Sequence, residues 1–199
     1  MSICHNRIRV TVAPGFLLLA ALLFYLDDGI GILPWVLLSA MVHEGGHIGA
    51  SILFGGKVEA AFLSIVGAEL RFSYSSPLSY LRENVVALAG PAVNLVVGCV
   101  LVWCGRLVPG MMSLYLGLFN LLPVCPLDGG RILFNVIAEY FGLSAAERVM
   151  MVSGGICIGI FVGLGVIAAV EYMNFTIIFG AAWLLLVAVG RVDKKSAKK

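Results

Sequence analysis

Long apolar stretches constrain this chain more than any other feature of its sequence. Few charged side chains interrupt them, and they fall at residues 12–26, 31–54, 84–105, 109–125, 150–170 and 174–190. A helix needs about 20 mostly apolar residues to cross the hydrocarbon core of a bilayer. With 61% hydrophobic and 12% charged residues, the chain is too apolar for a soluble fold of its size. The sequence therefore predicts an all-α polytopic membrane protein, a single domain over residues 1–199 with about six transmembrane helices.

The positions of the basic residues predict the orientation in the membrane. Arg7 and Arg9 precede the first stretch, and Arg191 and four lysines follow the last. The positive-inside rule then places both termini in the cytoplasm. Of the 13 Lys and Arg residues, only Arg106 falls on the outer side in this arrangement. The expected location is the cytoplasmic membrane of a bacterium, because the sequence has no targeting extension.

The sequence excludes several other classes of site and partner. Its five cysteines are scattered and form no C-x-x-C pair, so neither a disulfide framework nor a thiolate zinc site is predicted. The basic cluster at 194–199 is too short for a nucleic-acid surface, so no nucleic-acid partner is expected. The residues at 27–29 offer no signal-peptidase site, so the first stretch is expected to remain.

Residues 57–76 differ from the apolar stretches around them. Two short apolar runs flank Gly67, and Pro77 follows. This pattern predicts a small β-hairpin between the second and third helices, with an irregular amphipathic loop as the alternative. Because open strand edges cannot face lipid, we expect the hairpin at the cytoplasmic face or in a cavity lined by protein.

The motif H-E-G-G-H at residues 43–47 lies within the second apolar stretch. On a helix, positions four apart share one face, so the imidazoles of His43 and His47 can reach one zinc ion. Glu44 projects on the same side, where it can take a proton from water at the metal and return it to a leaving amine. Ionisable groups at membrane depth cost about 2.5–3.5 kcal/mol or more each. Such a cluster therefore indicates a functional site rather than a packing feature.

A hydrolytic zinc site needs a third protein ligand and an open position. Asp128 is the best candidate, because the prolines and glycines at 120–130 break the fourth span beside it. Broken backbone at membrane depth is tolerated where it lines a site or a cavity. A thiol and several carboxylates expected to face water are weaker candidates: Cys125, Glu139, Glu147 and Glu171. We therefore predict one Zn²⁺ per chain, held by His43, His47 and Asp128.

The predicted orientation places the three ligands in the same half of the membrane. The second and fourth spans both run from outside to inside, with Asp128 at the inner end of its span. The active site is therefore expected toward the cytoplasmic side. Zinc with two neutral imidazoles, one carboxylate and one hydroxide carries no net charge, which suits a low dielectric.

Three motifs make the chain resemble the site-2 proteases, which are intramembrane metalloproteases. They are H-E-G-G-H at 43–47, A-G-P-A-V-N at 89–94 and N-L-L-P-V-C-P-L-D-G-G at 120–130. The third is the most specific, since the family pairs an asparagine and a proline with a later Asp-Gly that supplies the remaining zinc ligand. Over about residues 10–190, the chain is most similar to the small sporulation-type branch, which processes a membrane-associated pro-sigma factor.

The resemblance implies a catalytic core over about residues 31–142, formed by the second, third and fourth spans, with the other three spans flanking it. It implies the same three zinc ligands and Glu44 as the catalytic base. It also implies an edge strand within 57–72 that holds the substrate extended. Asn94 and Asn120 could bind the substrate backbone or stabilise an oxyanion; interhelical hydrogen bonds are the alternative role.

The resemblance also implies a membrane-associated protein substrate, with a regulatory partner in the membrane as a further candidate. No PDZ-like insertion and no nucleotide-sensing CBS-type domain are found in the sequence, so regulation by an attached soluble domain is not expected. The pro-sigma substrate rests on the branch resemblance alone, because no residue here is expected to recognise a sigma factor.

Two other functions fit part of the pattern. A metal transporter would need further ligands along a route to the outer face, and the outer halves of the spans contain none. A catalytically inactive scaffold or chaperone would be expected to have lost part of the motif, which is intact. We therefore predict an enzyme that hydrolyses peptide bonds of transmembrane or membrane-associated proteins. The sequence sets neither the substrate nor the oligomeric state.

Overall fold

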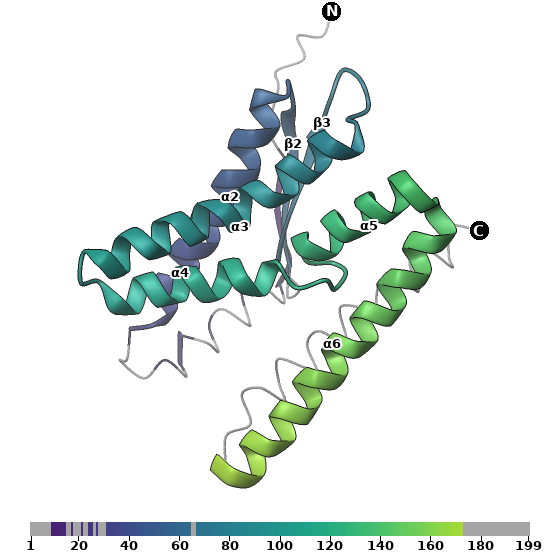
Figure 1. The fold of residues 1–199 in the computed structure, drawn as a ribbon. Helices are drawn as coiled ribbons and strands as arrows, with labels where there is room; N and C mark the ends of the chain where they lie inside the picture. The colour runs from purple at the N-terminus through teal and green to yellow at the C-terminus, as the bar shows by residue number, and fades with distance from the viewer. Residues whose placement is uncertain are drawn as a thin grey trace, which may run out of the picture. The chain divides into compact units, whose positions relative to one another are not determined.

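The fold is that of a computed structural model, which describes residues 9–14, 17, 21, 24, 25, 27, 31–64 and 67–172. The chain divides into two compact units, Met1–Leu118 and Phe119–Lys199. The first unit contains strands β1 to β3 and helices α2, α3 and nearly all of α4 (Figure 1). The second contains helices α5 and α6.

Helix α2 spans Leu33–Leu53 and has a proline in its first turn, where the missing N–H costs no hydrogen bond. Its buried face is largely polar and includes Ser39, His43, His47 and Ser51. Its large apolar side chains point outward, and Met41 is 71% exposed. A soluble amphipathic helix has the opposite arrangement, so α2 is suited to a lipid environment in which polar side chains face other helices.

Helix α3 (Tyr80–Trp103) packs closely against α4 (Leu107–Asn120). A Cβ atom at Gly98 would lie 2.7 Å from a side chain of α4, so only a glycine leaves enough room there. Ser113 on α4 donates a hydrogen bond to the backbone carbonyl of Asn94 on α3, at 2.9 Å. Close helix approach through small residues, joined by hydroxyl hydrogen bonds, is typical of membrane helices.

A three-stranded sheet accompanies the helices of the first unit, in the order β1-β2-β3. Strands β2 (Lys57–Ser64) and β3 (Gly67–Ser73) pair antiparallel, which confirms the predicted hairpin. Strand β1 (Arg9–Val12) was not predicted and pairs parallel with β2. Because β2 is flanked on both sides, the edge strand expected within 57–72 is limited to β3.

A hydrogen bond attaches the end of the hairpin to α2. The hydroxyl of Tyr74, just after β3, donates to Oγ of Ser51 at 2.9 Å. Ser51 has 0% of its surface exposed, so this bond is made inside the protein. Beside it, a Cβ atom at Gly56 would lie 2.6 Å from the ring of Tyr74. The hairpin is therefore held at the end of α2 by a buried contact.

The second unit is built around the loop at 121–127. This loop follows α4 and leads into α5 (Asp128–Phe141), and α6 (Leu143–Tyr172) comes next. The buried side chains of Val124 and Leu127 form its core, together with Phe119, Leu122, Cys157, Ile158 and Phe161. Ser153 on α6 donates a hydrogen bond of 2.8 Å to the carbonyl of Pro123. These contacts fix the loop on α6.

Three of the described helices are long and apolar enough to cross a membrane: α2, α3 and residues Leu143–Glu171 of α6. They correspond to the spans predicted at 31–54, 84–105 and 150–170. The span predicted at 109–125 is shorter, because α4 ends at Asn120, where turns containing prolines begin. The span predicted at 12–26 lies largely, and that at 174–190 wholly, outside the described residues. Six spans therefore remain a prediction.

Candidate metal centre

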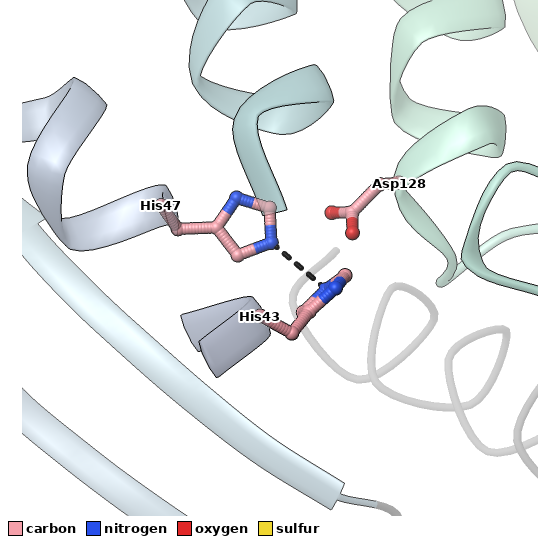
Figure 2. Close-up of side chains that lie close together, drawn as sticks. All are labelled: His43, His47 and Asp128. Atoms are coloured by element: carbon pink, nitrogen blue, oxygen red, sulfur yellow. Dashed lines mark hydrogen bonds between the residues drawn. The ribbon is translucent and has the colours of Figure 1, made fainter. Parts of the chain in front are cut away.

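His43 and His47 lie side by side on the buried face of α2, with 6% and 7% of their surfaces exposed. Their Nε2 atoms face each other at 3.1 Å, and the ring planes are 85° apart (Figure 2). The helix brings them together because residues four apart lie one turn above each other. The predicted pairing of the two imidazoles is therefore present in the first unit.

Helix α3 holds both rings from the other side. The Nδ1 atom of His47 lies 2.8 Å from the carbonyl oxygen of Val86 and donates its proton to it. The side-chain amide nitrogen of Asn94 lies 3.5 Å from Nδ1 of His43. In both rings, Nδ1 is directed at α3 and Nε2 at the neighbouring ring. Partners of this kind on the far nitrogen orient metal-binding histidines.

Two glycines allow α2 and α3 to approach at this place. A Cβ atom at Gly90 on α3 would lie 2.5 Å from Nε2 of His47 and 3.0 Å from Cε1 of His43. One at Gly46 on α2 would lie 2.7 Å from the carbonyl oxygen of Ala89. Any other residue would push the helices apart or displace the rings. Gly90 belongs to the sequence motif at 89–94. The contact between Gly90 and the imidazoles depends on how the two helices pack, which the motif does not show.

The geometry of the histidine pair fits a zinc ion. Zinc–nitrogen distances of about 2.0–2.1 Å with tetrahedral angles place two ligand nitrogens about 3.3 Å apart. The two Nε2 atoms here are 3.1 Å apart. Because His47 donates from Nδ1, its Nε2 carries the lone pair that a metal requires. The pair can therefore supply two ligands of one ion.

Asp128 is the first residue of α5, in the second unit, and 6% of its surface is exposed. A carboxylate in the first turn is stabilised by the positive end of the helix dipole. Arg131, one turn further on, places its Nη1 3.7 Å from Oδ1 of Asp128, but its side chain is 55% exposed. A half-exposed ion pair of this length contributes little stability.

The loop at 121–127 explains why two glycines follow Asp128. A Cβ atom at Gly129 would overlap the carbonyl group of Leu121, and one at Gly130 would overlap that of Val124. The loop therefore folds directly onto the first turn of α5, which only glycines permit. Asp128 is therefore held at the junction of a packed loop and a helix, a junction that was not predicted from the sequence.

The other predicted site residues also fall on the described elements. Glu44 is half-buried on α2, between the two histidines in sequence. Asn120 is the last residue of α4 and is half-buried, whereas Asn94 is fully buried on α3. Chemically, the described residues provide three buried side chains of the types that hold zinc, His43, His47 and Asp128. Glu44 adds a half-buried carboxylate on the same helix as the two histidines.

Comparisons with known proteins agree with this chemistry. Residues 106–164, which include Asp128, match peptidase family M50. A protein of Synechocystis sp. named as a zinc metalloprotease is 32% identical, over 83% of this chain and 50% of that protein. Stage IV sporulation protein FB of Bacillus subtilis is 25% identical, over 90% of this chain and 63% of that protein.

A solved structure gives the same fold. The site-2 protease from Methanocaldococcus jannaschii aligns with a TM-score of 0.69 at 23% identity, over 96% of this chain and 92% of that chain. The chain spans about half the length of the Synechocystis relative and 63% of the Bacillus one. It carries a peptidase family M50 region and has the fold of a site-2 protease.

Proposed function

We propose that this chain is an intramembrane zinc metalloprotease that hydrolyses peptide bonds of transmembrane or membrane-associated proteins. The observation that carries the proposal is the buried histidine pair on α2, an apolar helix long enough to cross a membrane, with Glu44 between the two ligands in sequence. Family M50 and the names of the relatives support the same chemistry.

Zinc held by His43, His47 and Asp128 would supply a Lewis acid that polarises a carbonyl group and lowers the pKa of water. The histidines belong to the first unit and Asp128 to the second, so their meeting at one ion is part of the proposal. Two neutral imidazoles and one carboxylate are a usual ligand set for hydrolytic zinc. This set leaves one coordination position for water or substrate.

Glu44 acts as the general base and then as the general acid. Its carboxylate removes a proton from the attacking water and delivers it to the leaving amine. It is half-buried on the same helix as the histidines, so it can reach the reacting atoms without being a ligand.

The substrate must be unwound before it is cut, because a helix shields its scissile carbonyl groups. We propose that β3 pairs with the substrate by strand addition, since its partner β2 is already paired on both sides. A pro-sigma factor or another regulatory protein is the proposed substrate class, in keeping with the likeness to a sporulation protein. The site opens toward the cytoplasm in this proposal, and both termini are cytoplasmic.

Quantitative mass spectrometry of membrane-protein fragments tests the function whichever protein is the substrate. Cells carrying the wild type are compared with cells carrying Glu44→Gln, which removes the base but keeps the size of the side chain and all three ligands. Fragments found only with the wild type are expected, and they name the substrate. Identical fragment profiles, with both proteins expressed and zinc-loaded and sporulation included among the growth conditions, would instead favour a scaffold.

A further inference from the structure

Asn94 is buried beside the metal-binding pair, on the face of α3 that covers α2. It has 0% of its surface exposed, so a substrate chain cannot touch it in this structure. Its amide nitrogen lies 3.5 Å from Nδ1 of His43, and its amide oxygen is buried without a hydrogen-bond partner among the described residues. Buried polar atoms nearly always have partners, so this oxygen requires an explanation.

The two nitrogens of His43 allow two arrangements of a single proton. With the proton on Nε2, that atom donates to the lone pair of His47 at 3.1 Å, and Nδ1 accepts from the amide nitrogen of Asn94. With the proton on Nδ1, Nε2 carries a lone pair directed at the neighbouring ring. Binding a metal through Nε2 requires the second arrangement, and Nδ1–H then needs an acceptor inside the protein.

The amide of Asn94 can provide this acceptor. Its oxygen and nitrogen have nearly the same shape and are distinguished only by hydrogen bonding. Turning the amide by half a rotation brings the oxygen to the position 3.5 Å from Nδ1 of His43. The oxygen then accepts from Nδ1–H, the amide nitrogen takes the former position of the oxygen, and His43 is fixed in the tautomer that binds through Nε2. Val86 does the same for His47 with a backbone carbonyl.

We propose that Asn94 is a positioning residue, whose amide oxygen accepts a hydrogen bond from Nδ1–H of His43 and so leaves Nε2 of His43 with the lone pair that binds the metal. This inference rests on the proposed zinc site and gives Asn94 a role through His43 rather than through the substrate. Removal of such partners typically weakens metal binding by about 10–100-fold.

Metal affinity of the full chain, purified in detergent, tests the proposal through competition with a zinc chelator. Asn94→Leu keeps the branched shape of the side chain but accepts no hydrogen bond, and we expect its zinc affinity to fall by about 10–100-fold. Asn94→Asp keeps an acceptor and is expected to bind zinc within a few-fold of the wild type. Substitution with cobalt should show an altered visible spectrum for Asn94→Leu alone.

Ser113→Ala is the matched control. It removes the hydrogen bond to the backbone carbonyl of Asn94, so it disturbs the packing around the same residue but leaves the amide in place. Unchanged zinc affinity in this variant is the expected result. Equal losses in Ser113→Ala and Asn94→Leu would overturn the proposal, because packing would then explain both. Wild-type affinity in Asn94→Leu would overturn it as well.

A measurement on the wild type keeps the proposal testable if a variant fails to fold. The chain has 3 histidines, so nitrogen-15 spectra of histidine-labelled, zinc-loaded protein can assign each tautomer. We expect Nδ1 protonated and Nε2 metal-bound in both His43 and His47. A His43 that carries its proton on Nε2 and binds zinc through Nδ1 would contradict the proposal.

These results distinguish the proposed function from the positioning role of Asn94. A wild-type chain that takes up no zinc at His43 and His47 would contradict both the proposed function and this inference. Zinc bound there with the expected fragments in cells, but with affinity indifferent to Asn94→Leu, would remove the positioning role alone.

Discussion

Gly90, Val86 and Asn94 supply no metal ligand, yet these three residues of α3 determine how the histidines on α2 are held. Gly90 leaves room for the rings. The backbone carbonyl of Val86 accepts a hydrogen bond from His47, and Asn94 lies next to His43. Ligands in a metal site need such support, because a free imidazole can rotate and change tautomer. The orientation of the two imidazole rings therefore depends on the neighbouring helix α3.

Gly90→Ala tests this dependence directly. The new methyl group would lie 2.5 Å from Nε2 of His47, so the rings or the helices must move, and overpacking of this kind costs about 1–3 kcal/mol. We expect loss of bound zinc, measured as zinc per chain after purification. Gly49→Ala on α2 is the control, since a Cβ atom there meets nothing within 4 Å. Full zinc content in Gly90→Ala would contradict the packing described here.

The contacts that could be predicted from the sequence are those between residues that lie close together in the chain. His43 and His47 are four apart, so helix geometry alone places them on one face. The contacts of Val86 and Asn94 join residues 39 and 51 positions apart in sequence. They depend on how α3 packs against α2, which the pattern of apolar residues does not specify. Asn94 was predicted as a substrate-binding residue, and its position next to His43 was not foreseen.

The same distinction holds for the elements. The hairpin of β2 and β3 follows from two short apolar runs around a glycine. Strand β1 has only four residues, and it pairs with a strand about 50 positions later. Four residues carry too little pattern to predict such a distant parallel pair. Helix α5 was likewise not separated from the broken span, and α4 ends at Asn120 rather than at the predicted residue 125.

The attachment of the hairpin to α2 gives a prediction for this element. Tyr74→Phe removes the hydrogen bond to buried Ser51, at a cost of about 1 kcal/mol. We expect faster hydrogen exchange in β2 and β3, measured by mass spectrometry, with zinc content unchanged because the histidines lie elsewhere. Tyr115→Phe serves as control, since Tyr115 is 57% exposed on α4. Exchange that is equal in both variants would show that this bond does not hold the hairpin.

At the scale of the whole molecule, the long apolar helices indicate a membrane protein, and the positions of the basic residues predict its orientation. Three described helices can cross a bilayer, and α4, with 14 residues, is about 21 Å long at 1.5 Å per residue. This is shorter than the hydrocarbon core of about 30 Å. If α4 is a span as the sequence predicts, the broken backbone after it lies at membrane depth and must be enclosed by protein.

The predicted orientation can be tested with a native cysteine. Cys104 is exposed at the end of α3, next to Arg106, which the positive-inside rule places outside. In a variant that keeps only this cysteine, a membrane-impermeant maleimide should label intact cells. Lys57→Cys in a background without other cysteines should react only after permeabilisation. The reverse pattern would invert the orientation and place the active site toward the outer face.

We propose that His43, His47 and Asp128 hold a single zinc ion. The most direct measurement is zinc per chain in the purified wild type and in His43→Ala, His47→Ala, Asp128→Ala and Glu44→Gln. The account predicts one zinc in the wild type and in Glu44→Gln, and its loss in the three ligand variants. Zinc bound by Asp128→Ala with wild-type stoichiometry and affinity would contradict the shared site.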